Sequence, residues 1–332
     1  MIRGNIDIDY QNVDDKVLLK ADGMPTYHLA VVVDDYLMKI THAFRGEEWL
    51  PSAPIHIKLW KDLFGLENMP AWAHLPLILK PDGNGKLSKR DGERLGFPVY
   101  AMEWKDPSTG SVHPGFKELG FLPEAFINLL AVLGWNDGTE QEIYSMKELI
   151  DDFSIERIHQ TGAKFNFEKA KWYNHEWIKK LPVTQYSDTV KSIFALQGIR
   201  IGDEQYFHEV LEMVKDRCTL LPEFAEQAKF FFQTPEKIEV ESVKPKWNDE
   251  KRQFFEIYLN LILDSTTWES TELESGFKTL AAEKKLKPGE VLMPLRVMLV
   301  GGKFGPAVFK IAEKIGKTET IKRIQMGLEQ LP

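Results

Sequence analysis

Residues 75–90 read LPLILKPDGNGKLSKR, an apolar stretch that runs into a loop rich in turn-forming residues and cations. The apolar part, 75–79, has the length of a buried strand, and the Pro, Asp, Asn and Gly residues that follow favour turns. Lys86 and Lys89 then lie three positions apart, with Ser88 between them. A cationic loop directly after an apolar strand is a common place for phosphate chemistry. The stretch is therefore a candidate site for binding phosphate groups.

This loop has a plain alternative and a second functional one. An arbitrary Lys-x-Ser-Lys is usually a solvated charged turn. A Walker-type phosphate loop needs Gly six positions before its lysine and Ser or Thr directly after it, where this chain has Lys80 and Leu87. Residues 86–90, Lys-Leu-Ser-Lys-Arg, instead resemble the signature loop of class I aminoacyl-tRNA synthetases at every position. This resemblance implies that the loop faces the triphosphate of ATP.

Other parts of the chain resemble bacterial glutamyl-tRNA synthetases in order and spacing. The matching stretches include DGMPTYHLA at 22–30, RGEEW at 45–49, FLPEAFIN at 121–128, FNFEKAKWYN at 165–174 and MPLR at 293–296. The resemblance extends from Arg3 to Leu328. Family members also carry a His-Ile-Gly-His-type motif, which these 332 residues lack. We therefore expect the chain to be the C-terminal portion of such a synthetase, with Met1 near the end of its acceptor-stem insertion.

The composition excludes several classes of protein. Apolar residues make up 43% and charged residues 28%, as in ordinary globular chains rather than disordered ones. No apolar run reaches about 18 residues, so no membrane span and no membrane partner are predicted. Cys218 is the single cysteine, which excludes an internal disulfide and a Cys-rich zinc site. Because no secretory signal is visible at the N-terminus, we expect a cytoplasmic protein.

The formal net charge is −8, from 42 Lys and Arg against 50 Asp and Glu. A general nucleic-acid binder would normally be basic, so contacts with RNA must use local basic patches. The resemblance implies such contacts with tRNA, at its acceptor stem and at its anticodon. Lys169 and Lys171 lie in a local excess of lysines, and Arg217 resembles an arginine near the third anticodon base in family members. Arg296 lies in an apolar helix, which favours a structural role.

The chain shows short α/β elements first and helices afterwards. Residues 17–20 and 40–46 favour strands that run into turns, and 52–65 favours a helix. For 29–33 the composition favours a buried strand, while periodicity leaves a buried helix open. Beyond Leu122 apolar residues recur at helical spacing. The predicted helices are 123–134, 146–152, 166–180, 187–197, 203–217, 222–232, 247–263, 271–284, 290–299, 306–315 and 318–329.

These elements predict an α/β fold followed by an all-α region. By the resemblance, residues 1–110 form the second half of a Rossmann-like catalytic domain that carries the Lys-Leu-Ser-Lys-Arg loop. Residues 111–185 form a helical domain that contacts the tRNA stem. Residues 186–332 form a helical anticodon-binding domain. We expect the protein to be a monomer.

The resemblance assigns three loop residues to catalysis. Lys86 and Lys89 bracket a mobile loop, Lys89 contacts a phosphate of ATP, and Ser88 donates a hydrogen bond. Stabilising phosphate charge is the main electrostatic task of such a reaction. Glu48 and Trp49 match a pair beside the adenosine of ATP. Mg²⁺ is expected with ATP, held largely by the phosphates.

Recognition of glutamate requires a cation for its side-chain carboxylate. An arginine offers a planar bidentate fork, and Arg45 stands in the position of the family's carboxylate-reading arginine. Tyr27 resembles the tyrosine that lines the amino-acid pocket. No metal site is predicted, because the histidines of this region lack a third ligand in a recognisable spacing. The pair Asp34-Asp35 indicates a helix cap or a bond between elements rather than a magnesium site.

The resemblance implies a glutamate–tRNA ligase, which forms glutamyl-adenylate and pyrophosphate from glutamate and ATP and then charges the tRNA. We expect the chain itself to bind tRNA weakly and not to activate glutamate alone. Two alternatives stay open. Glutaminyl-tRNA synthetases usually build their anticodon region from β-barrels, whereas this tail is helical in pattern. A non-catalytic RNA-binding protein has no need of the lysine loop. Whether the parent enzyme also charges the tRNA for glutamine is open as well.

Overall fold

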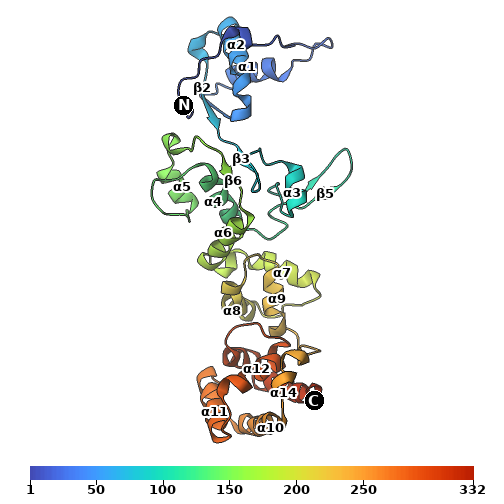
Figure 1. Cartoon of the computed structure of the whole chain (residues 1–332). Helices are drawn as coiled ribbons and strands as arrows, with labels where there is room; N and C mark the ends of the chain where they lie inside the picture. The colour runs from blue at the N-terminus through green and yellow to red at the C-terminus, as the bar shows by residue number, and fades with distance from the viewer. The chain divides into compact units, whose positions relative to one another are not determined.

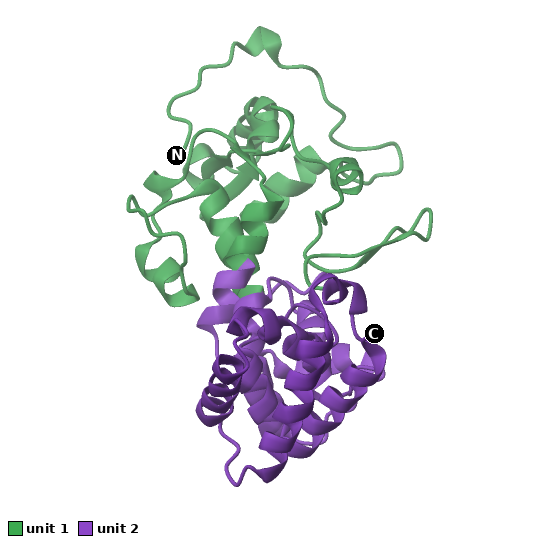
Figure 2. Cartoon of the chain, turned by 60° about the horizontal axis from the view of Figure 1, so that its bottom comes forward, with its two compact units in different colours: residues 1–118, 123–173 green, residues 119–122, 174–332 purple.

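The computed structural model describes residues 1–332. The chain divides into two compact units, which Figure 2 colours separately. Unit 1 comprises residues 1–118 and 123–173, and unit 2 comprises residues 119–122 and 174–332. None of the helices is both long and apolar enough to cross a membrane. The division into three domains remains a prediction.

Unit 1 begins with a small α/β layer. Its elements are α1 (Tyr27–Leu37), β1 (His42–Gly46), α2 (Ala53–Leu63) and β2 (Ala71–Leu75). β1 and β2 pair in parallel, and the register sets Arg45 opposite His74. A parallel pair needs a crossover connection, and α2 lies in that connection (Figure 1). The buried core of this layer consists of Val32 from α1 with Leu59 and Trp60 from α2.

Residues 29–33 belong to helix α1, so the strand favoured by their composition is wrong. Val32 is buried against α2, whereas Leu37 is exposed, so only one face of this segment is covered. Packing against α2 therefore selects the helix. A five-residue apolar run does not carry that information, because it is compatible with a buried strand and with a buried helix.

The remaining predictions near the N-terminus have different outcomes. The strand predicted at 17–20 is wrong, because only a single bridge between Leu19 and Pro25 forms there. The strand predicted at 40–46 is confirmed as β1. The helix predicted at 52–65 is confirmed as α2.

The cationic loop lies between β3 and α3. The elements of this part are β3 (Ile78–Leu79), α3 (Lys89–Leu95), β4 (Trp104–Lys105), β5 (Val112–His113) and β6 (Ala163–Lys164). β3 pairs in parallel with β6, and β4 pairs with β5 in an antiparallel hairpin. The loop is thus held between a strand on one side and a helix with an attached hairpin on the other.

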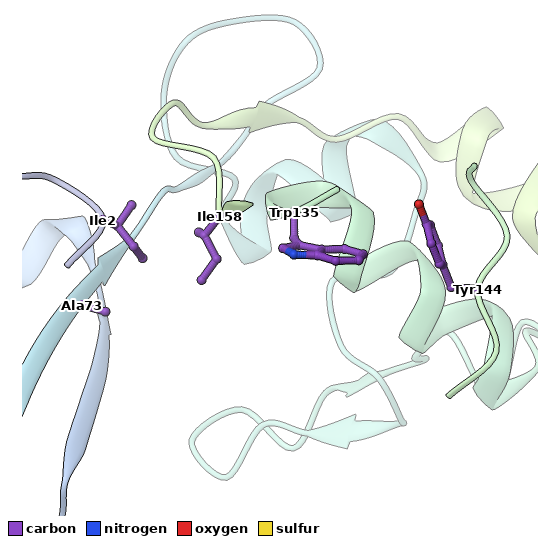
Figure 3. Close-up of a cluster of buried hydrophobic side chains, with 5 residues drawn as sticks. All are labelled: Ile2, Ala73, Trp135, Tyr144 and Ile158. Carbon is purple, nitrogen blue, oxygen red and sulfur yellow. The ribbon is translucent and has the colours of Figure 1, made fainter. Parts of the chain in front are cut away.

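The rest of unit 1 is helical and is joined to the sheet layer by one apolar cluster. Its helices are α4 (Pro123–Gly134), α5 (Met146–Asp152) and the first part of α6 (Phe167–Lys180). In the cluster, Ile158 lies between the pair Ile2 and Ala73 and the indole of Trp135, with Tyr144 beyond it (Figure 3). The N-terminal residues and β2 therefore share a core with the segments around α4 and α5.

Unit 2 is built of helices, as predicted. They are the rest of α6, α7 (Ser187–Leu196), α8 (Glu204–Val214), α9 (Glu223–Ala228), α10 (Asp249–Asp264), α11 (Ser270–Glu283), α12 (Pro288–Val300), α13 (Val308–Ile315) and α14 (Lys317–Gln330). The ring of Phe277 on α11 has its centroid 5.0 Å from Phe254, 4.9 Å from Tyr258 and 5.4 Å from Phe309. These edge-to-face contacts join α10, α11 and α13. The predicted α/β fold followed by an all-α region is confirmed.

Asn174 on α6 explains why the short segment 119–122 belongs to unit 2. Its side chain is fully buried. The Oδ1 atom accepts a hydrogen bond from the Leu122 backbone N–H at 2.7 Å. The Nδ2 group donates to the carbonyl oxygens of Thr219 at 2.7 Å and of Gly120 at 3.2 Å. One amide thus satisfies backbone groups from two distant segments, and its bonds to Leu122 and Gly120 are buried.

We predict that Asn174→Ala lowers the free energy of unfolding of unit 2 by about 3 kcal/mol, because it leaves buried backbone groups without partners. Urea unfolding followed by helical circular dichroism measures this change. Asn84→Ala, in an exposed loop, is the matched control and should change the free energy by less than about 0.5 kcal/mol. Equal values for the two variants would contradict this account of segment 119–122.

Candidate active site

The carboxylate of Asp91 anchors the end of the cationic loop. It accepts hydrogen bonds from the Ser88 backbone N–H at 3.0 Å and from the Ser88 hydroxyl, which makes a capping box at the start of α3. Lys80 lies 3.1 Å away and Arg94 lies 3.4 Å away. The hydrogen bonds from Ser88, together with those from Lys80 and Arg94, hold the pKa of Asp91 well below its usual range. Asp91 therefore stays ionised and ties both ends of the loop together.

The loop itself is a narrow hairpin. The Leu87 N–H donates to the carbonyl of Ile78 at 2.8 Å, and the Lys80 N–H donates to the carbonyl of Gly85 at 2.9 Å. These bonds set Lys86 at the base of the hairpin, beside β3. The predicted loop is thus a hydrogen-bonded turn directly after strand β3, and its mobility remains a prediction.

The two lysines of the loop have different partners. Lys86 forms an ion pair with Glu48, in which its ammonium donates a hydrogen bond to the carboxylate. This hydrogen bond lowers the pKa of the Glu48 carboxyl. Lys89 begins α3 and places its ammonium 4.3 Å from the ring centroid of Trp104 and 5.2 Å from that of Tyr100. Each cation is therefore held by another part of unit 1. The phosphate contact assigned to Lys89 remains a prediction.

The structure brings together four of the predicted site residues from three segments. The rings of Tyr27 on α1 and Trp49 are 4.6 Å apart between centroids. Trp49 follows Glu48 in the turn after β1, and Glu48 holds Lys86 of the loop. Because Glu48 and Trp49 are consecutive residues, these two contacts connect Tyr27 of the predicted amino-acid pocket with Lys86 of the predicted phosphate loop. We call them the Tyr27 to Lys86 series of contacts.

Arg45 lies near this series but has an internal partner. Its Nη2 donates to Asp35 Oδ2 at 3.0 Å, and its guanidinium lies 5.5 Å from the ring centroid of Trp72. For Asp35, this bond between α1 and β1 confirms the second of the two predicted roles, a link between elements. An arginine has five N–H donors, so the pairing with Asp35 leaves others for a substrate carboxylate. The glutamate-binding roles of Arg45 and Tyr27 remain predictions.

Two buried histidines behind Arg45 were not expected from the sequence. His56 on α2 is 1% exposed, and His74 on β2 is 8% exposed. The His56 Nε2 lies 3.0 Å from the His28 Nδ1, so one ring donates and the other accepts. Burial, with the charge of Arg45 next, lowers the pKa of His56 to about 4 and also lowers the pKa of His74. Both rings are therefore neutral at pH 7. His56 lies within the predicted helix 52–65 and His74 directly precedes the apolar stretch 75–79, and neither position reveals that the two rings are buried near Arg45.

The predicted tRNA contacts are spread over both units. Lys169 pairs with Glu142 at 2.6 Å and lies 4.2 Å from the ring centroid of Trp172. Lys171 pairs with Glu168 at 2.8 Å. Arg217, at the end of a short 3-10 helix after α8, is exposed. Their contacts with tRNA remain predictions.

Arg296 on α12 has the structural role that its apolar helix favours. Its Nη1 donates to the carbonyl oxygens of Phe304, Gly305 and Pro306, at 3.0, 2.9 and 2.7 Å. Arg296 therefore fixes the turn that leads into α13. Over the whole chain, no group of three or more His, Cys, Asp and Glu side chains is arranged to hold a metal ion.

Two protein families match this chain. Residues 1–172 match tRNA synthetases class I (E and Q), catalytic domain, and residues 168–328 match the anticodon binding domain. The chain belongs to the class I tRNA synthetases of the E and Q group. The loop, the Tyr27 to Lys86 series of contacts and the sheet layer all lie within the part that matches the catalytic domain.

Glutamate–tRNA ligases of several bacteria are similar to this synthetase chain along its whole length. That of Christiangramia forsetii is 44% identical over 331 residues, which are 100% of this chain and 65% of that protein. That of Flavobacterium psychrophilum is 46% identical over 334 residues, with the same coverage of 100% and 65%. The crystal structure of a glutamate tRNA ligase from Elizabethkingia meningosepticum in complex with its amino acid matches with a TM-score of 0.93 and 40% identity. The match covers 100% of this chain and 65% of the chain in that crystal structure. The chain thus spans 65% of the length of these relatives, and the resemblance stated from its motifs is confirmed.

We predict that Asp91→Asn speeds hydrogen–deuterium exchange of the Lys80 and Leu87 amides by about tenfold, because an uncharged amide holds Ser88 and Lys80 less firmly. Mass spectrometry of peptides that cover the loop measures the rates. Asp82→Asn is the control, since Asp82 makes an exposed pair with Arg94 and contributes little. If Asp82→Asn loosened the loop as much as Asp91→Asn, Asp91 would not be its anchor.

We predict that unit 1 loses stability as the pH falls from about 6.5 towards 4, through His56. The folded pKa of about 4 lies below the ordinary 6.5, so the unfolded chain binds more protons in this window and acid favours unfolding. The slope reaches about 1.4 kcal/mol per pH unit for one group, and His74 adds in the same direction. Urea unfolding between pH 5 and 7 should show a shallower slope for His56→Gln than for His42→Gln, which alters an exposed histidine. Identical slopes would rule out the role of His56.

Proposed function

We propose that this synthetase chain takes part in the attachment of glutamate to its tRNA, at the expense of ATP. The observation that carries the proposal is the series of contacts from Tyr27 through Trp49 and Glu48 to Lys86. It links the ring pair Tyr27 and Trp49, on the same small α/β layer as the partly buried Arg45, with a cationic hairpin. A dicarboxylic amino acid and a triphosphate need those two environments side by side. The names of the relatives support glutamate as the amino acid.

In this proposal the residues of the chain bind and orient rather than transfer protons. Arg45 offers its remaining N–H donors to the side-chain carboxylate of glutamate, and Tyr27 covers the pocket beside it. An oxygen of the α-carboxylate of glutamate attacks the α-phosphorus of ATP, the bond from that phosphorus to the β-phosphate oxygen breaks, and glutamyl-adenylate and pyrophosphate form. Lys89 and Lys86 balance the negative charge that moves onto the leaving pyrophosphate. Mg²⁺ enters with ATP on its phosphates.

The tRNA is the proposed acceptor of the activated glutamate. The match of residues 168–328 to an anticodon binding domain supports contact with the anticodon. Anticodon bases are single-stranded, so side chains read them by stacking and by hydrogen bonds to their edges. The helical character of unit 2 favours the glutamate type over a glutaminyl-tRNA synthetase with a β-barrel anticodon region. We propose that the protein acts as a monomer in the cytoplasm.

We predict that Arg217→Ala weakens binding of glutamate tRNA by about tenfold or more, as expected for loss of an arginine that contacts a base edge. Filter binding at fixed salt measures the affinity, because phosphate contacts make every value salt-dependent. Arg200→Ala, which removes another exposed arginine of unit 2, is the matched control. Loss of affinity that is equal for glutamate tRNA and for an unrelated tRNA would identify Arg217 as a backbone contact. Absence of any tRNA binding would refute the proposed function.

The expectation that this chain alone does not activate glutamate remains a prediction. Its basis is that the 332 residues contain no His-Ile-Gly-His-type motif. Glutamate-dependent exchange of pyrophosphate into ATP is the direct assay. If exchange were found, the expectation would be wrong.

A further inference from the structure

An aromatic pair follows the cationic loop along the chain. Tyr100 and Trp104 stack with their centroids 5.1 Å apart and an interplanar angle of 19°. We call these two residues the aromatic shelf. His113 on β5 borders the shelf, with its ring 5.7 Å from that of Trp104. The shelf therefore combines the segment after α3 with the β4–β5 hairpin.

The ammonium of Lys89 lies over both rings of the shelf. The Nζ atom is 4.3 Å from the centroid of Trp104 and 5.2 Å from that of Tyr100. Both distances fall within the roughly 6 Å at which a ring face attracts a cation. Lys86 of the same loop pairs with a carboxylate instead. The second lysine is thus held by π systems and not by an opposite charge.

Several local contacts keep the shelf next to Lys89. Trp104 and His113 are paired across the β4–β5 hairpin, which lies beside α3 in Figure 1. His113 Nδ1 lies 3.1 Å from the carboxylate of Glu93 on α3. The helix also approaches the following chain closely, since a Cβ on Gly92 would lie 2.8 Å from the carbonyl oxygen of Phe97. The shelf and the helix that carries Lys89 are therefore built as one piece.

We propose that Tyr100 and Trp104 are positioning residues that hold the Lys89 ammonium beside the loop until a phosphate takes it. The identity of that phosphate, a group of ATP, rests on the proposed function. An exposed cation–π contact favours the held state by about two- to fivefold over free rotation of the side chain. A charge-assisted hydrogen bond to phosphate is stronger, so the shelf limits the freedom of Lys89 without competing with the nucleotide. A carboxylate in the same place would repel the incoming phosphate.

Ring-current shifts in the NMR spectrum of the ¹³C-lysine-labelled chain test this placement. We expect the ε-methylene signal of Lys89, assigned by its loss in Lys89→Arg, to lie upfield of the signals of exposed lysines. Trp104→Phe keeps an aromatic face and should retain part of the shift. Trp104→Leu keeps an apolar side chain without a ring and should move the signal most of the way to the exposed position. Val112→Ala, on the same hairpin, is the matched control and should leave the signal in place.

Two results would overturn the proposal. One is a Lys89 signal at the exposed position in the parent chain. The other is an unchanged upfield signal in Trp104→Leu. If the leucine variant disturbs the hairpin, the spectra of the parent chain and of Trp104→Phe still show whether Lys89 lies over the rings.

MgATP and magnesium tripolyphosphate are added in two separate titrations. Their outcomes distinguish a failure of this inference from a failure of the proposed function. Binding should move the Lys89 signal away from its upfield position. If MgATP shifted the Lys86 signal and left Lys89 over the rings, the release of Lys89 to phosphate would be refuted. If neither ligand changed any lysine signal, the ATP-binding role would fail, while the spectra of the parent and variant chains would still decide whether the shelf holds Lys89.

Discussion

The geometry of this site depends on the negative charge of Asp91. That carboxylate caps α3 through Ser88 and attracts Lys80 and Arg94, which would otherwise repel each other across a short loop. Hydrogen bonds keep its pKa well below the usual range, so the charge persists throughout the physiological pH range. With the loop closed in this way, Lys89 starts α3 at a defined place and Lys86 reaches Glu48.

Each cation of the site has an internal partner of a different kind. Lys86 is paired with Glu48, Arg45 with Asp35, and Lys89 with the aromatic shelf. A charge that lost water on folding and gained no partner would destabilise the fold, so some compensation is required. The partners differ in how easily a ligand replaces them. The exposed Lys86–Glu48 pair and the contact of Lys89 with the aromatic shelf are weak, so a ligand can replace either partner. The Arg45–Asp35 pair is largely buried and is better suited to remain when a ligand binds.

Much of this arrangement follows from local sequence. Turn-forming residues, helix caps and apolar spacing each act over a short stretch of sequence. They encode the cationic hairpin, the strand at 40–46, the helix at 52–65 and the helices beyond Leu122. The resemblance to a synthetase family indicates the motif residues on α1, after β1 and in the loop. Two contacts, Tyr27 with Trp49 and Glu48 with Lys86, connect these three segments. Where the local pattern was ambiguous, at 29–33, the neighbouring helix decided the outcome.

The sequence by itself therefore determined the class of fold, the position of the loop and the identity of its charges, because these depend on residues close together along the chain. Only the tertiary structure decided which partner each charge has. Glu48 and Lys86 are 38 positions apart, and His28 and His56 are 28 apart. Such pairs are set by the parallel pairing of β1 with β2 and by the packing of α1 on α2. No short-range pattern records those distances, since they arise when separate elements bury their apolar faces together.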